Sequence, residues 1–218
     1  MPKFDSYTII PPKLLGGIVK KILLLSFFFI NLWAQNDYDF RVAYGRADSN
    51  DFGEIISSQI SPHHTGTHVM MLDAGYKVAE NVLDLPIDIY VKAGFAKFLE
   101  NGYQKDVYEN TLYLKAYYNF DFLENRVRLG AAEGGSYTYG IIYIEKEEAV
   151  AKNGKNSHFL NYLELSLDFD LGKLVKYKPL ENTYLGLVLK HRSGIYGVIN
   201  NVKHGGSNYE AVYIEKNF

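Results

Sequence analysis

The 218-residue chain is 47% hydrophobic and 22% charged, which allows one domain with a substantial core and excludes a disordered or fibrous protein. Its 23 Lys and Arg against 25 Asp and Glu give a net charge of -2, so nucleic acid is not an expected partner. The chain has no cysteine, which excludes disulfides, thiolate metal sites and a cysteine nucleophile, and its 19 Tyr and 13 Phe favour β-structure.

The N-terminal segment has the order of a secretory signal peptide. Lys20 and Lys21 precede an apolar run at 22–32, and Ala34 supplies the small residue after which cleavage is expected. The run is too short for a membrane-spanning helix, which needs roughly 20 residues. We therefore predict an N-terminal extension and signal peptide at 1–34 and a folded domain at 35–218.

Apolar residues in the rest of the chain recur with a period of two, which is typical of β-strands. The alternation is clearest where Ile87, Ile89 and Val91 share one face of a strand and polar residues occupy the other. Strands are predicted at 38–45, 68–77, 86–98, 111–120, 126–138, 160–170, 183–193 and 208–218.

The connections between these strands alternate in length. Long ones are predicted at 47–67, 99–110, 139–159 and 194–207, and short ones at 78–85, 121–125 and 171–182. This alternation is typical of outer-membrane barrels, and the aromatic last residue, Phe218, resembles their terminal strand signature. We predict an all-β fold, an eight-stranded antiparallel transmembrane β-barrel in the bacterial outer membrane, which the barrel assembly machinery would insert. Apolar side chains would face lipid, and small or charged ones would fill a lumen too narrow for a channel. A soluble lipocalin-like carrier with the apolar face inside is the alternative.

Two polar residues stand out at the end of the seventh predicted strand. His191 and Ser193 are two positions apart, so they share a face with Leu187 and Leu189 and should point toward lipid. An unsatisfied polar group in hydrocarbon is costly. The pair therefore indicates a function that acts on a lipid at the outer rim.

The stretch His191-Arg192-Ser193, with the glycine-rich segments 194–197 and 205–208 that follow it, resembles the lipid A 3-O-deacylase family of eight-stranded outer-membrane barrels. Residues 160–164 resemble the wider set of acyloxyacyl hydrolase-like barrels. The resemblance implies a carboxylic ester hydrolase whose partner is lipid A, or lipopolysaccharide, in the outer leaflet. It implies Ser193 as nucleophile, His191 as base, and no metal or organic cofactor.

A third side chain is expected to orient the imidazole of His191. In the family this residue is a carboxylate, and its position falls near Asn208 of this chain. The nearest carboxylate on the same face of the strand is Glu210, two positions further on. Both residues remain candidates. The backbone N–H around Gly194 is a candidate for an oxyanion hole.

The remaining polar groups are interpreted as structural. His63, His64 and His68 have a spacing compatible with a metal ion, but they lie in or beside a long predicted loop and are expected to be solvated. Residues 145–156 are predicted to belong to a mobile outer loop. Charged strand residues should pair inside the lumen where the alternation of the strand turns them inward. The candidates are Arg41, Arg128, Glu133, Glu164 and Asp168. The alternative function is a non-enzymatic barrel acting in structure, adhesion or surface interaction.

Overall fold

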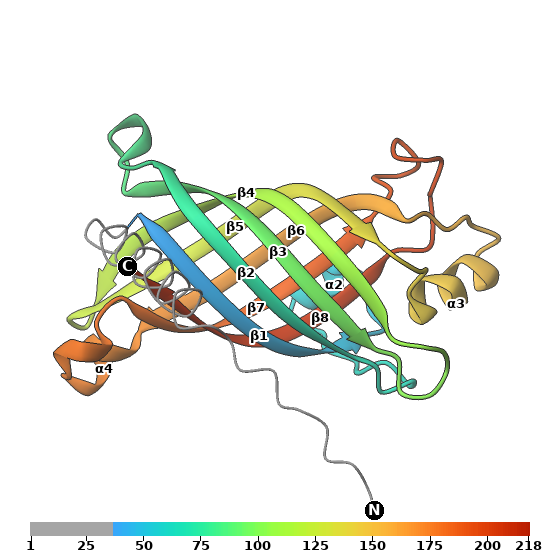
Figure 1. Cartoon of the computed structure of the whole chain (residues 1–218), viewed down its shortest axis with the longest axis horizontal. Coiled ribbons are helices and arrows are strands. Elements are labelled where there is room, and N and C mark those ends of the chain that lie inside the picture. Colours follow the sequence, from blue (N-terminus) through green and yellow to red (C-terminus); the bar gives the residue numbers. More distant parts are fainter. Residues whose placement is uncertain (1–36) are drawn as a thin grey trace, which may run out of the picture.

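A computed structural model describes residues 37–218, which form a closed antiparallel barrel in which each strand pairs with its sequence neighbours and β8 closes onto β1 (Figure 1). The strands are β1 (Tyr38–Asp48), β2 (His68–Ala79), β3 (Ile87–Leu99), β4 (Val107–Phe122), β5 (Asn125–Thr138), β6 (Phe159–Asp170), β7 (Thr183–Ser193) and β8 (Ser207–Asn217). The predicted eight-stranded barrel is confirmed. The predicted extension and signal peptide at 1–34 lie outside the described residues.

The two ends of the barrel differ, because most of the long connections lie at one end; the predicted alternation fails at β3–β4, whose connection at 100–106 is as short as that of β2–β3 at 80–86. The end with the long connections, here called the outer end, carries α2 (Phe52–Ile56) and α3 (Tyr143–Ala151). The opposite, inner end carries η1 (Val82–Asp84), α4 (Leu171–Val175) and η2 (Lys178–Leu180). Figure 1 shows α3 and α4 at opposite ends of the barrel. In the described part of the chain, no helix is both long and apolar enough to cross a membrane.

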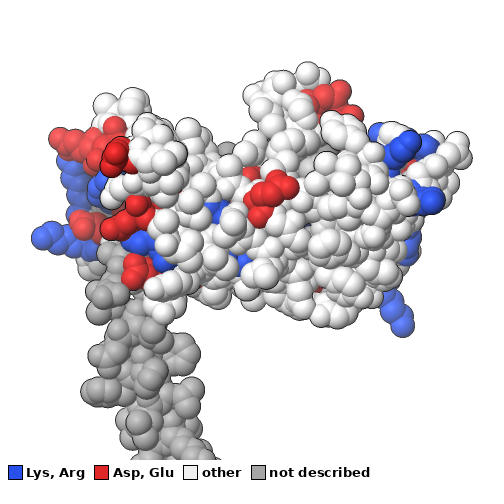
Figure 2. All heavy atoms as spheres, turned by 90° about the horizontal axis from the view of Figure 1, so that it is seen from above, with Lys and Arg blue, Asp and Glu red and all other residues white. Residues whose placement is uncertain are grey.

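The outer wall of the barrel is apolar. Alternate residues on each strand point outward, and large hydrophobic side chains among them are exposed, such as Leu112 on β4, Leu187 on β7 and Val212 on β8. On the face shown in Figure 2, charged residues gather mainly toward the two ends, and the wall between them is largely uncharged apart from an acidic group near its middle. An exposed, predominantly apolar belt is the surface that a barrel presents to lipid. The lipocalin-like alternative, which required this face inside, is wrong.

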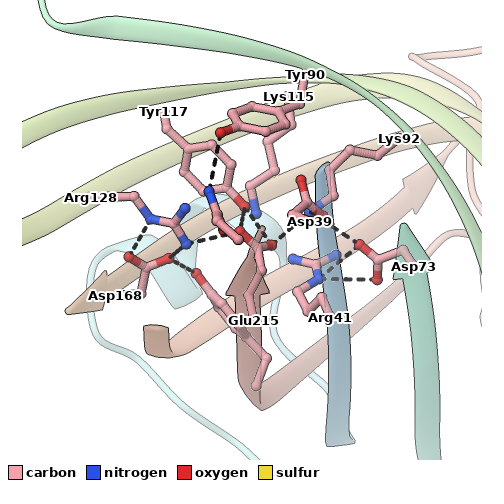
Figure 3. Close-up of polar contacts among 12 residues, drawn as sticks. Asp39, Arg41, Asp73, Tyr90, Lys92, Lys115, Tyr117, Arg128, Asp168 and Glu215 are labelled. Carbon is pink, nitrogen blue, oxygen red and sulfur yellow. Dashed lines mark hydrogen bonds and ion pairs between the residues drawn. The ribbon is translucent and has the colours of Figure 1, made fainter. Parts of the chain in front are cut away.

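Charged and aromatic side chains fill the lumen. The guanidinium of Arg41 donates to both carboxylate oxygens of Glu164, at 2.7 and 2.8 Å. Lys92 lies between Asp39, at 2.7 Å, and Glu215, at 2.6 Å (Figure 3). The barrel therefore contains a packed polar core, as expected for eight strands.

Arg128 joins this polar core through two carboxylates. It contacts Asp168 at 2.7 Å and Glu215 at 2.9 Å (Figure 3). The predicted pairing inside the lumen is thus confirmed for Arg41, Arg128, Glu164 and Asp168.

The start of β4 differs from the prediction, because the strand begins at Val107 and not at 111. The additional residues extend the polar core toward the outer end. Glu109 faces the lumen there and accepts from Lys190 at 2.6 Å. The sequence pattern alone misses these first residues of the strand, because their inward side chain, Glu109, is charged and resembles a loop residue.

The loop predicted at 145–156 is in part a helix, because residues 143–151 form α3 at the barrel mouth, whereas 152–156 have no regular structure. Ile142 and Ile144 are buried with Phe98 and Val107. Glu145 turns into the lumen and accepts from Arg192 Nε and Ser207 Oγ, both at 2.8 Å. Burial raises the pKa of the Glu145 carboxyl, and the adjacent Arg192 guanidinium offsets part of this rise.

Replacing Glu145 with alanine is expected to loosen α3 from the barrel mouth. The variant loses two hydrogen bonds to a charged acceptor, each worth about 1.5–3 kcal/mol, so amide exchange across 143–151 should accelerate by about 100-fold or more. Hydrogen exchange monitored by mass spectrometry measures this. Val150, which is 81% exposed on the same helix, provides the control Val150→Ala. Equal exchange in Glu145→Ala and the wild type would show that the apolar contacts hold α3 without the carboxylate.

Candidate functional site

Four polar residues predicted from the sequence point outward near the outer end of β7 and β8. His191 and Ser193 alternate with Lys190 and Arg192, whose side chains are buried in the lumen. Asn208 and Glu210 lie on the outward face of β8, together with the exposed Val212 and Ile214. The strand parity inferred from the sequence is therefore correct, and the four side chains share one patch of the outer wall.

The register of β7 and β8 decides which residue of β8 meets the imidazole. His191 pairs with Asn208, whereas Glu210 pairs with Leu189. His191 Nδ1 lies 2.7 Å from Asn208 Oδ1. Glu210 instead faces Arg46 of β1, whose guanidinium is 3.4 Å away. In this structure the partner of His191 is thus the amide and not the carboxylate.

The hydrogen bonds of Asn208 fix the tautomer of His191. The amide nitrogen of Asn208 donates to the carbonyl oxygen of Asn50 at 2.8 Å, so its Oδ1 must face the imidazole. An amide oxygen only accepts hydrogen bonds, so Nδ1 of His191 must carry a proton and donate it. Nε2 of neutral His191 then keeps its lone pair free, which is the state that a general base needs.

The β1–β2 connection covers the imidazole from one side. The ring of Phe52, the first residue of α2, lies 4.9 Å from the ring of His191. Asn50 supplies the carbonyl that holds Asn208. Sequence reasoning did not identify Asn50 or Phe52, because both lie about 140 positions from His191 and no local pattern marks the contact.

Ser193 lies two residues closer to the outer rim than His191. It is paired with Asn161 of β6, and its hydroxyl makes no hydrogen bond within residues 37–218. The structure therefore places Ser193 on the same face as His191 without joining the two side chains. Catalytic hydrogen bonds are often loose before a substrate binds.

Gly194 begins the connection that follows Ser193. A Cβ at Gly194 would lie 2.0 Å from the carbonyl oxygen of Val202, so only glycine permits this close approach. Its own carbonyl accepts from the amides of Gly197 and Ile199. These contacts fold the connection tightly beside Ser193, and the oxyanion role of Gly194 stays a prediction.

Glu133 differs from the other charged strand residues that were assigned to the lumen. It is exposed on the outward face of β5, and Leu163 of β6 separates it from His191 along one row of the wall. Its parity with the outward Leu129 could have identified it from the sequence. Glu133 is thus a carboxylate on the lipid-facing wall, two strands from the imidazole.

A cavity of about 730 Å³ lies at the inner end, between the β4–β5 turn and α4. None of the predicted site residues lines it. The predicted site residues therefore lie on the outer wall, at the opposite end of the barrel from this cavity.

Replacing Asn208 with alanine is expected to remove the tautomer preference of His191. In the wild type at neutral pH, nitrogen-15 NMR should show the proton on Nδ1, and in Asn208→Ala it should show a mixture of tautomers. A reaction that used Nε2 as its general base should slow by roughly 100-fold, the lower range of general base contributions. Glu210→Gln is the matched control, because Glu210 faces Arg46 and should leave the tautomer unchanged. A wild-type spectrum with the proton on Nε2 would contradict this assignment.

Comparison with known proteins finds likeness in structure only. No family model matches the sequence, and no curated protein matches it. The crystal structure of the outer membrane enzyme PagL aligns over 83% of this chain and 99% of its own, with a TM-score of 0.56 and 10% identity. Neisserial surface protein A (NspA) aligns over 84% of this chain and 98% of its own, with a TM-score of 0.45 and 15% identity. The first likeness supports the outer-membrane barrel fold.

Proposed function

We propose that this protein is a bacterial outer-membrane serine esterase that removes an ester-linked acyl chain from lipid A. The observation that carries the proposal is the hydrogen bond between His191 and Asn208 on the lipid-facing wall, beside Ser193. A merely structural wall gains nothing from a prepared imidazole base in this position, because polar groups facing hydrocarbon are costly. The fold shared with an outer membrane enzyme and the resemblance of 191–193 to lipid A 3-O-deacylases support the same function.

The proposed reaction follows the serine esterase scheme. Nε2 of His191 takes the hydroxyl proton of Ser193 as Oγ attacks the ester carbonyl, and the imidazolium then gives the proton to the leaving sugar alkoxide. Water, activated by the same imidazole, releases the acyl group as a carboxylic acid and restores Ser193. Asn208 holds the imidazole but is neutral, so it stabilises the imidazolium less than a carboxylate would.

The wall below the site suits an acyl chain. Leu187 is 63% exposed and Val212 is 52% exposed, and both lie on the side of His191 that faces the membrane interior. An acyl chain of an outer-leaflet lipid can lie along these side chains without leaving the hydrocarbon. Its ester group, which lies near the headgroup, would then reach the level of His191 and Ser193.

Mass spectrometry of lipid A from bacteria that express the chain tests the proposal. We expect lipid A that has lost one hydroxyacyl mass, compared with cells that carry the empty vector. Unchanged lipid A, with the folded protein shown in the outer membrane, would contradict the proposal. That result would favour a non-enzymatic barrel that acts in structure, adhesion or surface interaction through its outer connections.

A further inference from the structure

Two histidines and a glutamate from distant parts of the chain meet at the outer end. His63 and His64 belong to the β1–β2 connection, and Glu147 belongs to α3. His64 Nε2 lies 3.1 Å from Glu147 Oε1, and His63 Nε2 lies 3.9 Å from Glu147 Oε2. One possible ligand atom from each of the three residues lies within 4.8 Å of the others.

One oxygen of this cluster has no partner. Glu147 Oε2 is buried and has no hydrogen-bond partner within the described residues. The 3.9 Å that separates it from His63 Nε2 is beyond hydrogen-bonding distance. Burying a carboxylate oxygen without a partner is costly, and a cation bound between the imidazoles would remove that cost.

The surroundings of His63 prepare its Nε2 to act as a ligand. His63 Nδ1 lies 2.8 Å from Thr65 Oγ1, which in turn lies 3.3 Å from Thr67 Oγ1. The Thr65 hydroxyl can accept a hydrogen bond from Nδ1 and donate one to Thr67 Oγ1, and the Thr65 backbone N–H, 3.4 Å from Nδ1, is a longer, competing donor. A hydrogen bond from Nδ1 to a neighbouring oxygen is the usual support for a metal-binding histidine, and it leaves the Nε2 lone pair free toward Glu147.

We propose that His63, His64 and Glu147 bind a divalent cation of the zinc class, which links the β1–β2 connection to α3. Two imidazole nitrogens, one carboxylate oxygen and a water complete a tetrahedral zinc site, whereas Mg²⁺ and Ca²⁺ prefer oxygen ligands. Metal–ligand distances of about 2.0–2.1 Å separate neighbouring ligands by about 3.3 Å, so the gaps, none of which exceeds 4.8 Å, must close by up to about 1.5 Å.

This site differs from the metal site that the sequence suggested. His68 takes no part, because it lies on β2 and its ring stacks on Tyr44 at 5.4 Å. Glu147 takes its place, although the sequence analysis assigned it to a mobile loop. The site is also distinct from the His191 patch, so it does not depend on the proposed esterase function.

A bound cation would act on the segment that covers His191. The β1–β2 connection carries Asn50 and Phe52, which contact Asn208 and His191. Linking this connection to α3 would hold both segments in place over the outer end of the barrel. We therefore expect the metal to slow amide exchange at 61–66 and 143–151.

Titration of the purified full-length protein in detergent with ZnCl₂, followed by calorimetry, tests the site. We expect one Zn²⁺ per chain with a Kd below about 10 µM, and at least about a 10-fold weaker Kd in both His64→Ala and Glu147→Gln, because each variant loses a ligand. MgCl₂ should give no comparable binding. His204→Ala, which removes an exposed histidine from the β7–β8 connection, is the matched control and should bind as the wild type does.

Two results would overturn the proposal. One is a wild-type Kd weaker than about 1 mM, a binding energy of about 4 kcal/mol that any surface histidine could supply. The other is unchanged binding in the triple variant His63→Ala/His64→Ala/Glu147→Gln, which would place the ion elsewhere. Heat-modifiable migration in electrophoresis shows whether each variant is folded. Zinc-dependent exchange protection at 61–66 and 143–151 provides a second readout for variants with altered stability.

Discussion

Ser193→Ala is expected to lower the rate of ester hydrolysis by about 1,000-fold or more, because alanine leaves no nucleophile for an acyl-enzyme. The serine faces outward and its hydroxyl makes no hydrogen bond in the described residues, so the barrel should fold and remain as stable as the wild type. The measurement is acyl release from purified lipid A in mixed micelles, with lipid A from expressing cells analysed in parallel.

His191→Ala should cause a loss of similar size, since the two residues act as one unit and their effects do not add. The matched control is Ser157→Ala, which removes a serine hydroxyl from the β5–β6 connection at the same end. If Ser193→Ala kept wild-type activity while His191→Ala lost it, another nucleophile or an activated water would carry the reaction. Equal activity in all variants would leave only the structural interpretation of the patch.

Glu164→Gln is expected to lower the free energy of unfolding by about 3–5 kcal/mol, the cost of breaking a buried ion pair by removing one charge. Glu164 accepts two bonds from Arg41 and contacts Lys115, and all three residues are fully buried. Glutamine keeps the shape but leaves both cations without their shared carboxylate. Urea unfolding from lipid vesicles, followed by far-ultraviolet circular dichroism, measures the change.

The control for the buried charge is an exposed ion pair of the same chemistry. Glu80 lies 3.1 Å from Lys77 and its side chain is 64% exposed, so Glu80→Gln should change the unfolding free energy by less than about 1 kcal/mol. A small effect at Glu164, similar to that at Glu80, would show that water or neighbouring carboxylates compensate inside the lumen. The interior charges would then contribute little to the stability of the barrel.

The sequence by itself determined the barrel and the direction of its side chains. Period-two alternation is a local property of strands, so residues such as Ile87 and Ile89 reveal a strand face without knowledge of its neighbours. The same rule correctly turned His191 and Ser193 toward lipid and Arg41 toward the lumen. It failed at the start of β4, where the charged inward Glu109 resembles a loop residue, and at 143–151, where a predicted loop folds into a helix that packs on the barrel mouth.

Only the tertiary structure decided which groups meet. The choice between Asn208 and Glu210 depended on the register of β7 and β8, which places them opposite His191 and Leu189 respectively. Phe52 packs over the imidazole of His191, and Glu147 lies near His63. Both contacts join segments that are far apart in the chain. Parity fixes the face of each residue locally, whereas register and docking depend on closure of the whole barrel and on packing between distant segments.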